Sequence, residues 1–442
     1  MTFTGNTVPY KSVWIAEYQA THYKQPVFPV FADQRFQDQL TAGQTLKWSY
    51  DSDSDVASMA LATGAYEVAN KTVTDETLTV DQAPTSAFRI PLTENIQDHR
   101  PTQAKWAQKA MNRIFWKMDA QMLGAMAAAA TSTIDASDGF GGSSGAGIAP
   151  TPSNAPAIFT AARRKLRNQN VIYDETRKWT GYMKLDNEAP MPVCAIPPEL
   201  EEQLLLAIGF KPGDMGDQVL KQGAMGFLFG FNAFVSTALP FQVKYTVASG
   251  NLSNGDTMVL GGNTFTFVSG TPSNAGEIKI GASATLTGDN IATALTAPFT
   301  DVSNVYKAFT RSSLTVAQAL VLGDSAAPLI SATNASGVVT IVALGNSSLS
   351  YSTTASNGSF SAPIIKALFG VSKSIALVMQ RYPSLTVSEG NIIGNGSTGG
   401  YVARDFVTWT LAGWKVFNTM AKQLVTVLID ATGFTAPNNV YN

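Results

Sequence analysis

Apolar residues at intervals of four mark the clearest helices. Over residues 94 to 130 such a series lies beside a row of basic residues, and this spacing predicts a long amphipathic helix that begins at or just before Pro101. The apolar series is Trp106, Ala110, Ile114, Met118, Met122 and Met126, and the basic row is Lys105, Lys109, Arg113 and Lys117. A Gly/Ser/Pro-rich stretch over residues 131 to 153 follows, and its composition predicts a flexible loop.

Two further helices are predicted after this loop. The run APAIFTAARRKLRNQ places Ile158, Ala162 and Leu166 four residues apart, with Ser153 or Asn154 as the helix cap. The run PPELEEQLLLAIGF has a proline and several glutamates at its start, which suits the positive N-terminal end of a helix.

Alternating residues predict a long two-stranded loop over residues 43 to 91. Its ends, TLKWSY and TLTVDQAPTSAFRIP, alternate as strands do, and the acidic middle is predicted to be an exposed tip. Two strands cannot bury their faces by themselves, so we expect the loop to lie on another chain.

The run QGAMGFLFGFNAFVSTALPFQV, residues 222 to 243, contains no charged residue. About 20 apolar residues suffice for a membrane-spanning helix, but the glycines, the polar residues and Pro240 disfavour a helix here. Most of the bulky residues lie at odd numbers: Phe227, Phe229, Phe231, Val235 and Leu239. This period of two predicts a sharply turned, buried β segment rather than a membrane span.

Charge density sets residues 242 to 365 apart, and we call them the low-charge segment. They hold nine charged residues in 124 positions and are rich in Gly, Ser, Thr, Asn and Ala. NGDTMVLGGNTFTFVSG predicts a β-hairpin turning at Gly261 and Gly262, and the alternation of Val339, Ile341 and Ala343 predicts a further strand. GDNIATALTA predicts a short helix capped near Asp289. The segment is therefore predicted to be a mostly β module inserted into another domain.

Composition excludes some classes of function. The chain of 442 residues has a formal charge of -2 and only 14% charged residues, so it lacks the basic field of a strong nucleic-acid binder. The single cysteine, Cys194, excludes an internal disulfide and is predicted to be a small buried hydrophobe. The N-terminus MTFTGNTVPYKSVW has no signal-peptide pattern.

Catalytic and metal-binding motifs are not found. His22 and His99 lack the spacing of a metal site, and the glycine runs GFGGSSGAG and GNGSTGG lack the Lys-Ser or Lys-Thr of a phosphate-binding loop. DSDSD at 51 to 55 lacks the glycine and distant glutamate of a calcium loop. No enzyme, cofactor or metal is therefore predicted. Four basic residues on the second helix, Arg163, Arg164, Lys165 and Arg167, leave a subunit interface, a nucleic-acid contact and a solvated face open.

The order of these parts resembles the major capsid proteins of tailed phages, whose fold is known as the Hong Kong 97 type. The resemblance is carried by an N-terminal arm, the loop from GQTLKWSY to TVDQAPTSAFRIP, a long helix containing KMDAQML, and PVCAIPPELEEQLL. GAMGFLFGFNAFVSTALP is similar to a segment of the family's axial domain, and KALFGVSKSIALVMQRYP and LAGWKVFNTMAKQLVTVLID resemble its later segments. Together they cover roughly residues 1 to 241 and 366 to 442, and the low-charge segment is similar to a small β domain recurrent in phage structural proteins.

The resemblance implies an α+β fold of the Hong Kong 97 type with an N-terminal arm, an extended two-stranded loop, a long spine helix, and peripheral and axial domains, plus an inserted mostly β domain. The implied divisions are the arm at 1–42, the extended loop at 43–91, the peripheral domain with the spine helix at 92–187, the axial domain at 188–241 and 366–410, the inserted domain at 242–365, and the C-terminal strands of the peripheral domain at 411–442.

The implied function is self-assembly into the hexamers and pentamers of an icosahedral shell that encloses phage double-stranded DNA. Portal and scaffolding proteins are implied as partners, the DNA would be held non-specifically, and no membrane is involved. The location is the virion capsid, assembled in the host cytoplasm. For the inserted domain, contacts between capsomers, a decoration protein and a host surface all stay open.

Inter-subunit contacts are implied for aromatic residues and one arginine. In the loop these are Trp48, Tyr50, Phe88 and Arg89, and in the arm they are Trp14 and Tyr18. Two other classes stay open. A bacterial nanocompartment shell shares the fold, whereas a secreted surface-layer or adhesin-type protein would account for the Ser/Thr/Asn-rich, low-charge segment.

Overall fold

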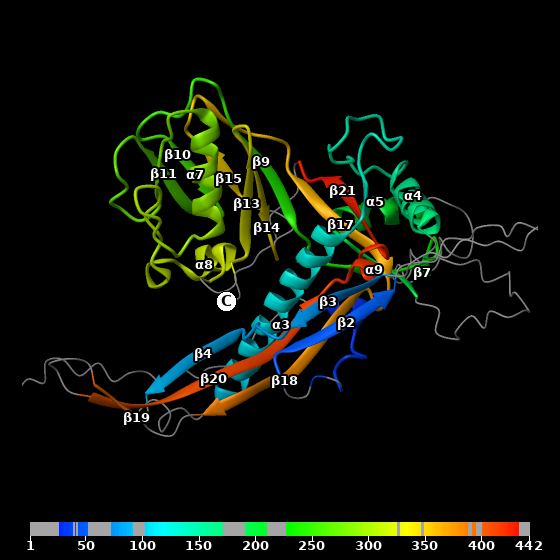
Figure 1. Cartoon of the computed structure of the whole chain (residues 1–442), viewed down its shortest axis with the longest axis horizontal. Helices are drawn as coiled ribbons and strands as arrows, with labels where there is room; N and C mark the ends of the chain where they lie inside the picture. The colour runs from blue at the N-terminus through cyan, green and yellow to red at the C-terminus, as the bar shows by residue number, and fades with distance from the viewer. Residues whose placement is uncertain are drawn as a thin grey trace, which may run out of the picture.

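The structure is a computed structural model that describes residues 26–38, 40, 43–51, 72–91, 102–169, 171, 191–209, 227–324, 328–345, 349–387, 391–394 and 400–432. Within these residues the chain has a mixed α+β fold with several sheets, so the predicted fold class is confirmed at this level. The low-charge segment forms one end of the molecule, and a five-stranded sheet lies along α3 at the other (Figure 1). His22, His99, Trp14 and Tyr18 lie outside the described residues.

Helix α3 (Thr102–Ala129) is the long helix that the four-residue spacing predicts. Its 28 residues extend about 42 Å at the usual rise of 1.5 Å per residue. From the second member on, the apolar series is buried: Ala110, Ile114, Met118, Met122 and Met126. The last four of these residues pack in the main core. This buried face fixes α3 between the two larger sheets of the molecule, so both sheets are oriented by one helix.

The largest sheet has ten strands in the order β13-β14-β9-β17-β6-β8-β7, with β16 beside β9, β21 beside β17 and β5 beside β21. Its strands are β5 (Ser132–Ile134), β6 (Pro192–Ile196), β7 (Phe227–Leu228), β8 (Phe231–Val235), β9 (Phe241–Val247), β13 (Ile330–Ala335), β14 (Val338–Ala343), β16 (Gly358–Phe360), β17 (Ile364–Val371) and β21 (Leu424–Asp430). Strands β17 and β21 are buried along almost their whole length and form the centre of the core.

The uncharged run at 222 to 243 is a turned β segment from residue 227 onward, as its pattern predicts. Phe229 (φ 50°) and Gly230 (φ 86°) both have left-handed backbone, which makes the tight turn between β7 and β8. Phe231 and Leu239 are fully buried, but Val235, which the pattern also predicts to be buried, is exposed. Val235 lies at the end of β8, where the neighbouring strand β6 also ends, so its side chain has less of the sheet to pack on. Residues 222 to 226 lie outside the described residues.

Helices α4 (Ala155–Asn168) and α5 (Pro198–Gly209) contact each other in the same region of the molecule. The predicted inner face of α4, which includes Ile158, Ala162 and Leu166, is fully buried. Asn154 does precede α4, but its side chain does not cap the helix. Its Oδ1 instead accepts a hydrogen bond from the amide of Thr151 at 2.8 Å, which closes the turn before the helix.

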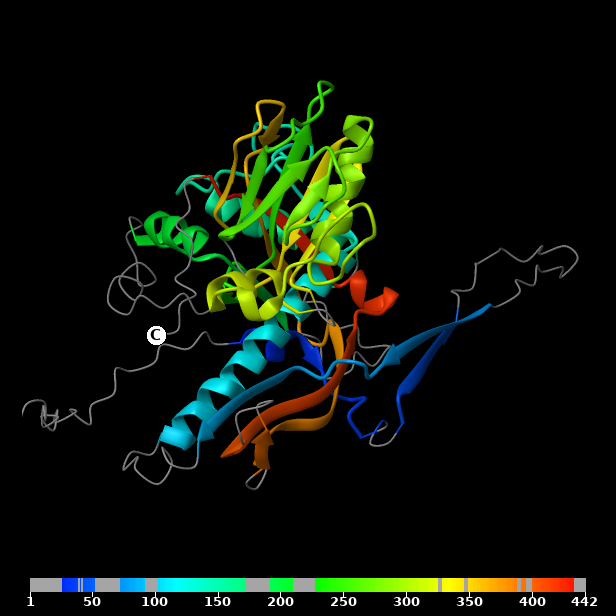
Figure 2. The ribbon, with the colours of Figure 1, turned by 90° about the vertical axis from the view of Figure 1, so that its left-hand side faces the viewer.

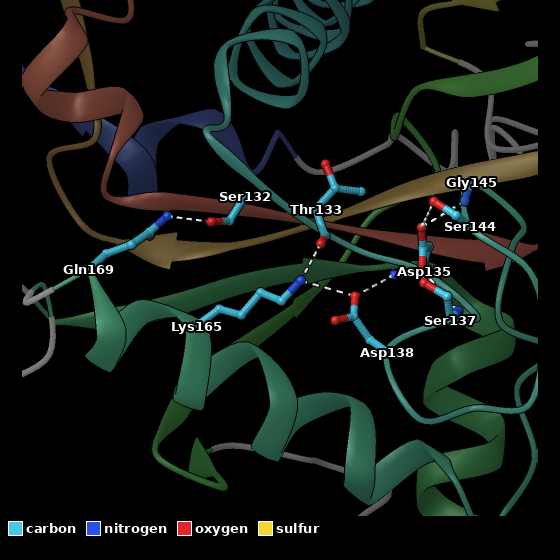
Figure 3. Close-up of polar contacts among 9 residues, drawn as sticks. All are labelled: Ser132, Thr133, Asp135, Ser137, Asp138, Ser144, Gly145, Lys165 and Gln169. Carbon is cyan, nitrogen blue, oxygen red and sulfur yellow. Dashed lines mark hydrogen bonds and ion pairs between the residues drawn. The ribbon is translucent and has the colours of Figure 1, made fainter.

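The loop at 131 to 153 is not the flexible linker that its composition predicts (Figure 3). Asp135 accepts hydrogen bonds from the amides of Ser137 (2.9 Å) and Gly145 (2.6 Å), and Lys165 of α4 pairs with Asp138 at 2.9 Å. The hydroxyl of Ser137 and the Gly145 amide lower the pKa of Asp135. Hydrogen bonds to side-chain acceptors thus order the loop where glycine and serine supply little packing. At the start of the loop, β5 also pairs with β21.

The low-charge segment contains the predicted hairpin. Strands β10 (Thr257–Leu260) and β11 (Asn263–Val268) turn at Gly261 and Gly262, both with positive φ, and join β12 (Glu277–Lys279) and β15 (Tyr351–Thr353) in a four-stranded sheet. The remaining elements are α7 (Ala284–Thr296), the short 3-10 helix Arg311–Ser313 and α8 (Val316–Leu322). The cap predicted near Asp289 is wrong, because α7 begins two turns earlier, where the Ser283 hydroxyl accepts from the Leu286 amide at 3.2 Å.

The large sheet continues into the low-charge segment, although the composition of the chain changes there. The chain enters the segment through β9 and returns through β17, and these strands are neighbours, with Phe241 opposite Ile365. Strands β14 and β13 continue the sheet on the other side of β9. One hydrophobic core also runs through both parts.

The predicted loop at 43 to 91 divides into two structures. Strands β2 (Thr45–Asp51) and β3 (Val73–Thr79) form the expected antiparallel pair, which projects from the body (Figure 2). The closing run TLTVDQAPTSAFRIP is not one strand of this pair, because β4 (Thr85–Pro91) follows the break at Pro84 and pairs with β20. The middle of the loop, 52 to 71, lies outside the described residues.

Strand β4 belongs to a five-stranded sheet. Its other strands are β1 (Ala32–Asp33), β18 (Ile375–Val387), β19 (Asn391–Gly394) and β20 (Gly400–Lys415). The short helices α1 (Phe28–Phe31) and α9 (Asn418–Ala421) complete the described elements. Strand β20 crosses the division expected at residues 410 and 411, and it connects the five-stranded sheet through α9 to β21 of the large sheet.

Candidate functional site

Trp48 packs within its own chain at the base of the β2–β3 pair. Its ring lies 4.8 Å from that of Phe36 and 5.1 Å from that of Phe417, measured between centroids. Leu46 and Leu78 belong to the same small cluster. The pair therefore rests partly on its own chain at its base, and this cluster fixes the direction in which the two strands leave the body.

The other loop candidates lie on two different strands. Tyr50, on β2, accepts a hydrogen bond from the Asn418 side chain at 3.2 Å. Phe88, on β4, stacks on Phe406 at 5.0 Å with nearly parallel rings. Arg89 is the next residue of β4, opposite Asp405 in the register. The structure does not bring Tyr50 together with Phe88 and Arg89, because β2 and β4 belong to different sheets. Their contacts with another chain stay a prediction.

Three of the basic residues on α4 surround a pocket of about 310 Å³. It is lined by Thr160, Arg163, Arg164, Arg167, Asn168 and Phe229. Arg163 donates to the carbonyl oxygen of Phe229 at 3.3 Å, while Arg164 and Arg167 are exposed. The fourth residue, Lys165, points elsewhere, to Thr133 and Asp138 (Figure 3). The sequence predicts that the arginines lie on one helix, but no local signal indicates that Phe229, 66 positions from Arg163, closes the pocket.

The first turn of α5 carries the opposite charge. Glu199 and Glu201 are half-buried and Glu202 is exposed. Burial raises the pKa of both Glu199 and Glu201, and the nearby charge of Glu202 adds to the effect on Glu199. Among the residues that the structure describes, none of the three glutamates forms an ion pair, and burial of a carboxylate without a compensating cation raises its pKa.

The row of basic residues on α3 meets the low-charge segment. Lys117 of α3 forms an ion pair with Asp324, and Arg311 approaches the same carboxylate at 3.9 Å. Next to this ion pair, Trp116 and Ala120 of α3 pack with Leu329. The low-charge segment is thus joined to α3 by apolar and charged contacts as well as through the sheet.

Cys194 does not have the environment of a reactive thiol. It is fully buried in β6, as predicted, and burial raises the pKa of its thiol. Among the residues that the structure describes, no group of three His, Cys, Asp or Glu side chains could hold a metal ion. None of the helices in the described part of the chain is long and hydrophobic enough to cross a bilayer.

Neither a protein-family model nor a curated protein matches the sequence. Solved structures do match. A structure from Mycobacterium phage Che8 aligns with a TM-score of 0.51 and 11% identity, covering 96% of this chain and 98% of its own. The capsid structure of cyanophage P-SCSP1u aligns with a TM-score of 0.47 and 11% identity, covering 97% of this chain and 95% of its own. The capsid of Ralstonia phage GP4 aligns with a TM-score of 0.43 and 9% identity, covering 100% of both chains. The first alignment shows that this chain shares its fold with a phage protein along nearly its whole length.

Proposed function

We propose that the chain is the major capsid protein of a tailed phage, with the Hong Kong 97-type fold, and that its copies assemble into the hexamers and pentamers of an icosahedral shell around double-stranded DNA. The observation that carries the proposal is the fold shared with the Mycobacterium phage Che8 structure over 96% of this chain and 98% of that one. The colinear sequence resemblance to tailed-phage major capsid proteins supports it independently, and the 28 residues of α3 suit the proposed role of a spine helix.

The charge balance suits this role. A formal charge of -2 over 442 residues gives the shell little attraction for phosphate, so DNA can be packed and released without tight binding. Shell stability would then come from many interlocking contacts, each of them weak. Portal and scaffolding proteins are the proposed partners, and the low-charge segment is the proposed site for any decoration protein.

The β2–β3 pair is proposed to reach an adjacent subunit. Tyr50 and Trp48 would contribute aromatic area from β2, and Phe88 and Arg89 would contribute separately from β4, in the five-stranded sheet. Trp14 and Tyr18 are proposed for the arm. Because the inner part of Trp48 already packs on Phe36 and Phe417, only its outer edge is free for a neighbouring chain.

Electron microscopy of the purified chain tests the proposal directly. The chain is expressed alone and together with the neighbouring phage genes, and closed shells or regular hexamers and pentamers are expected in at least one of the two samples. A folded monomer under both conditions, verified by sedimentation and circular dichroism, would contradict the proposed function.

A further inference from the structure

The pocket on α4 that Arg163, Arg164 and Arg167 line, which we call the arginine pocket, is positively charged and has no acidic residue in its lining. Neither Arg164 nor Arg167 forms an ion pair with any residue in the described ranges, and the pocket lining includes no Asp or Glu. The guanidinium of Arg163 lies against Gly230, whose added Cβ would come within 2.5 Å of Nη1. The left-handed turn at Phe229 and Gly230 thus holds one arginine in place and leaves the other two facing solvent.

The acidic turn of α5 is the complementary surface. Within the described part of the chain, Glu199, Glu201 and Glu202 form no ion pair, and Oε2 of Glu199 is buried without a hydrogen-bond partner. Glu201 also lies in the first turn of α5, at the positive end of the helix where negative charge is favoured, and Glu202 is the next residue.

The two charged surfaces lie at opposite ends of the same strands. Strands β6 and β8 are parallel, with Val193 opposite Asn232 and Ile196 opposite Val235. The turn at Phe229 and Gly230 precedes β8 and marks the starting end, whereas α5 follows β6 and begins at the finishing end. At about 3.3 Å per residue the strands span roughly 15 Å between these ends. Among the residues that the structure describes, no ion pair joins the two surfaces, and their placement at opposite ends of the strands suits a head-to-tail contact between chains.

We propose that the arginine pocket of one chain receives Glu201 and Glu202 from the α5 of a second copy, in a heterologous contact that repeats around a ring. This proposal deepens the proposed capsid function and rests on it. Heterologous contacts close into rings when their rotation closes, which is the geometry that hexamers and pentamers need. Arginine pairs with carboxylates through two parallel hydrogen bonds, and the apolar floor at Phe229 removes water from the pairs.

DNA phosphate fits the pocket less well. Phosphate binding by duplex DNA needs cations spread along a surface, whereas these three arginines lie within two turns of one helix around a single concave site. A glutamate side chain offers a carboxylate to the arginines and methylene groups to Phe229. The favoured occupant is therefore a second copy of the chain.

A charge swap tests the contact. Arg164→Glu with Arg167→Glu, and separately Glu201→Arg with Glu202→Arg, are each expected to lower the yield of rings or shells by about tenfold, because like charges then face each other. The four changes combined are expected to restore assembly. Arg163 and Glu199 are left unchanged, because Arg163 supports the Phe229 turn and Oε2 of Glu199 is buried. Sedimentation velocity and electron microscopy measure the assembled fraction.

Control variants separate the possible outcomes. The variant with Lys279→Glu and Lys422→Glu makes the same change of net charge away from the pocket and is expected to assemble normally. If circular dichroism shows that the charge reversal at the arginines unfolds the chain, Arg164→Gln with Arg167→Gln replaces it. The proposed contact is wrong if the arginine variants assemble normally or if the fourfold variant does not recover assembly. In both cases, shells formed by the wild-type chain would still support the capsid function. Reduced duplex-DNA retention by normally assembled arginine variants assigns the pocket to phosphate and also overturns the contact. A wild-type chain that never assembles overturns both proposals.

Discussion

At the residue scale, one buried carboxylate ties the start of the described chain to the long helix. Asp119 of α3 is 2% exposed and accepts the amides of Val27 (2.9 Å) and Phe28 (2.7 Å), at the N-terminus of α1. The N-cap residue of α1, Val27, has no side chain that could cap it. A residue 91 positions away therefore performs the capping, which no local pattern in the sequence predicts.

We expect Asp119→Ala to lower the free energy of unfolding by about 3 kcal/mol, because two buried amides lose their acceptor. Asp119→Asn keeps one carbonyl acceptor and is expected to lose less. Denaturant unfolding measures both, and limited proteolysis will cut before Phe36 faster in the alanine variant. Equal midpoints for Asp119→Ala and the wild type would show that these hydrogen bonds contribute nothing to stability.

The sequence predicts residue types better than residue partners. It indicates that Trp48 lies on a strand and that four basic residues lie on one helix, since both follow from periodicity. It does not indicate that Trp48 meets Phe417 or that Arg163 meets Phe229, because each contact joins distant parts of the chain. The sequence therefore predicts which charged and aromatic residues belong to the candidate site, but it does not predict the pocket that they form.

At the element scale, Gly413 allows β20 to pass close to the end of β3. A Cβ on Gly413 would come within 2.4 Å of the Thr79 carbonyl oxygen and 2.8 Å of the Val80 Cα. Both are backbone atoms, so neither can move without shifting the strand. This close approach holds the β2–β3 pair against the five-stranded sheet.

We expect Gly413→Ala to lower the free energy of unfolding by about 2 to 4 kcal/mol, because the backbones of β20 and β3 must separate. Gly270→Ala is the matched control, since a Cβ at Gly270 meets nothing within 4 Å, and its effect should stay within about 0.5 kcal/mol. Thermal unfolding of both variants measures the difference. The close-approach argument fails if the two alanine variants unfold at the same temperature.

Helices and hairpins with strong periodic patterns were predictable, and elements built by side-chain hydrogen bonds were not. Helix α3 and the β10–β11 hairpin follow the spacing of their apolar residues. The loop at 131 to 153 reads as a linker because glycine and serine dominate it, yet Asp135 organises it through the amides it accepts. Such an acceptor has no periodicity, so composition alone gives the wrong answer.

At the scale of the whole molecule, the low-charge segment leaves and rejoins the chain at one place in the sheet. Because Gln242 is opposite Ile364 and Phe241 is opposite Ile365, the two ends of the segment are neighbours. The segment also covers part of α3, where Leu329 packs with Trp116. The neighbouring ends favour removal of the low-charge segment without loss of the remaining fold, whereas its packing on α3 opposes such removal.

We expect a chain in which Asn-Gly replaces residues 244 to 362 to fold, since a two-residue turn can join neighbouring antiparallel strands. It should unfold at a lower denaturant concentration than the full chain, because Trp116 and Ala120 lose their cover. Circular dichroism and urea unfolding of the shortened chain measure both effects. An insoluble or unfolded product would show that the segment is an integral part of the fold.

The overall fold was predictable from the order of the parts, whereas the continuity of the large sheet was not. The change in composition at residue 242 is real, but it reflects which residues face solvent and not where hydrogen bonding stops. Pairing between β9 and β17 joins residues more than 120 positions apart, and neither the alternation of β9 nor the apolar run of β17 indicates its partner strand.

The junction between β9 and β17 also determines how the molecule carries mechanical load. Strand β9 shares two residue pairs with β17 but six with β14, and β17 shares seven with β21. Of these three pairings, the one between β9 and β17 is the shortest, and the contacts of Lys117 and Trp116 with the low-charge segment lie apart from it. Under tension we therefore expect the β9–β17 pairing to open before β14 or β21 leaves its neighbouring strand.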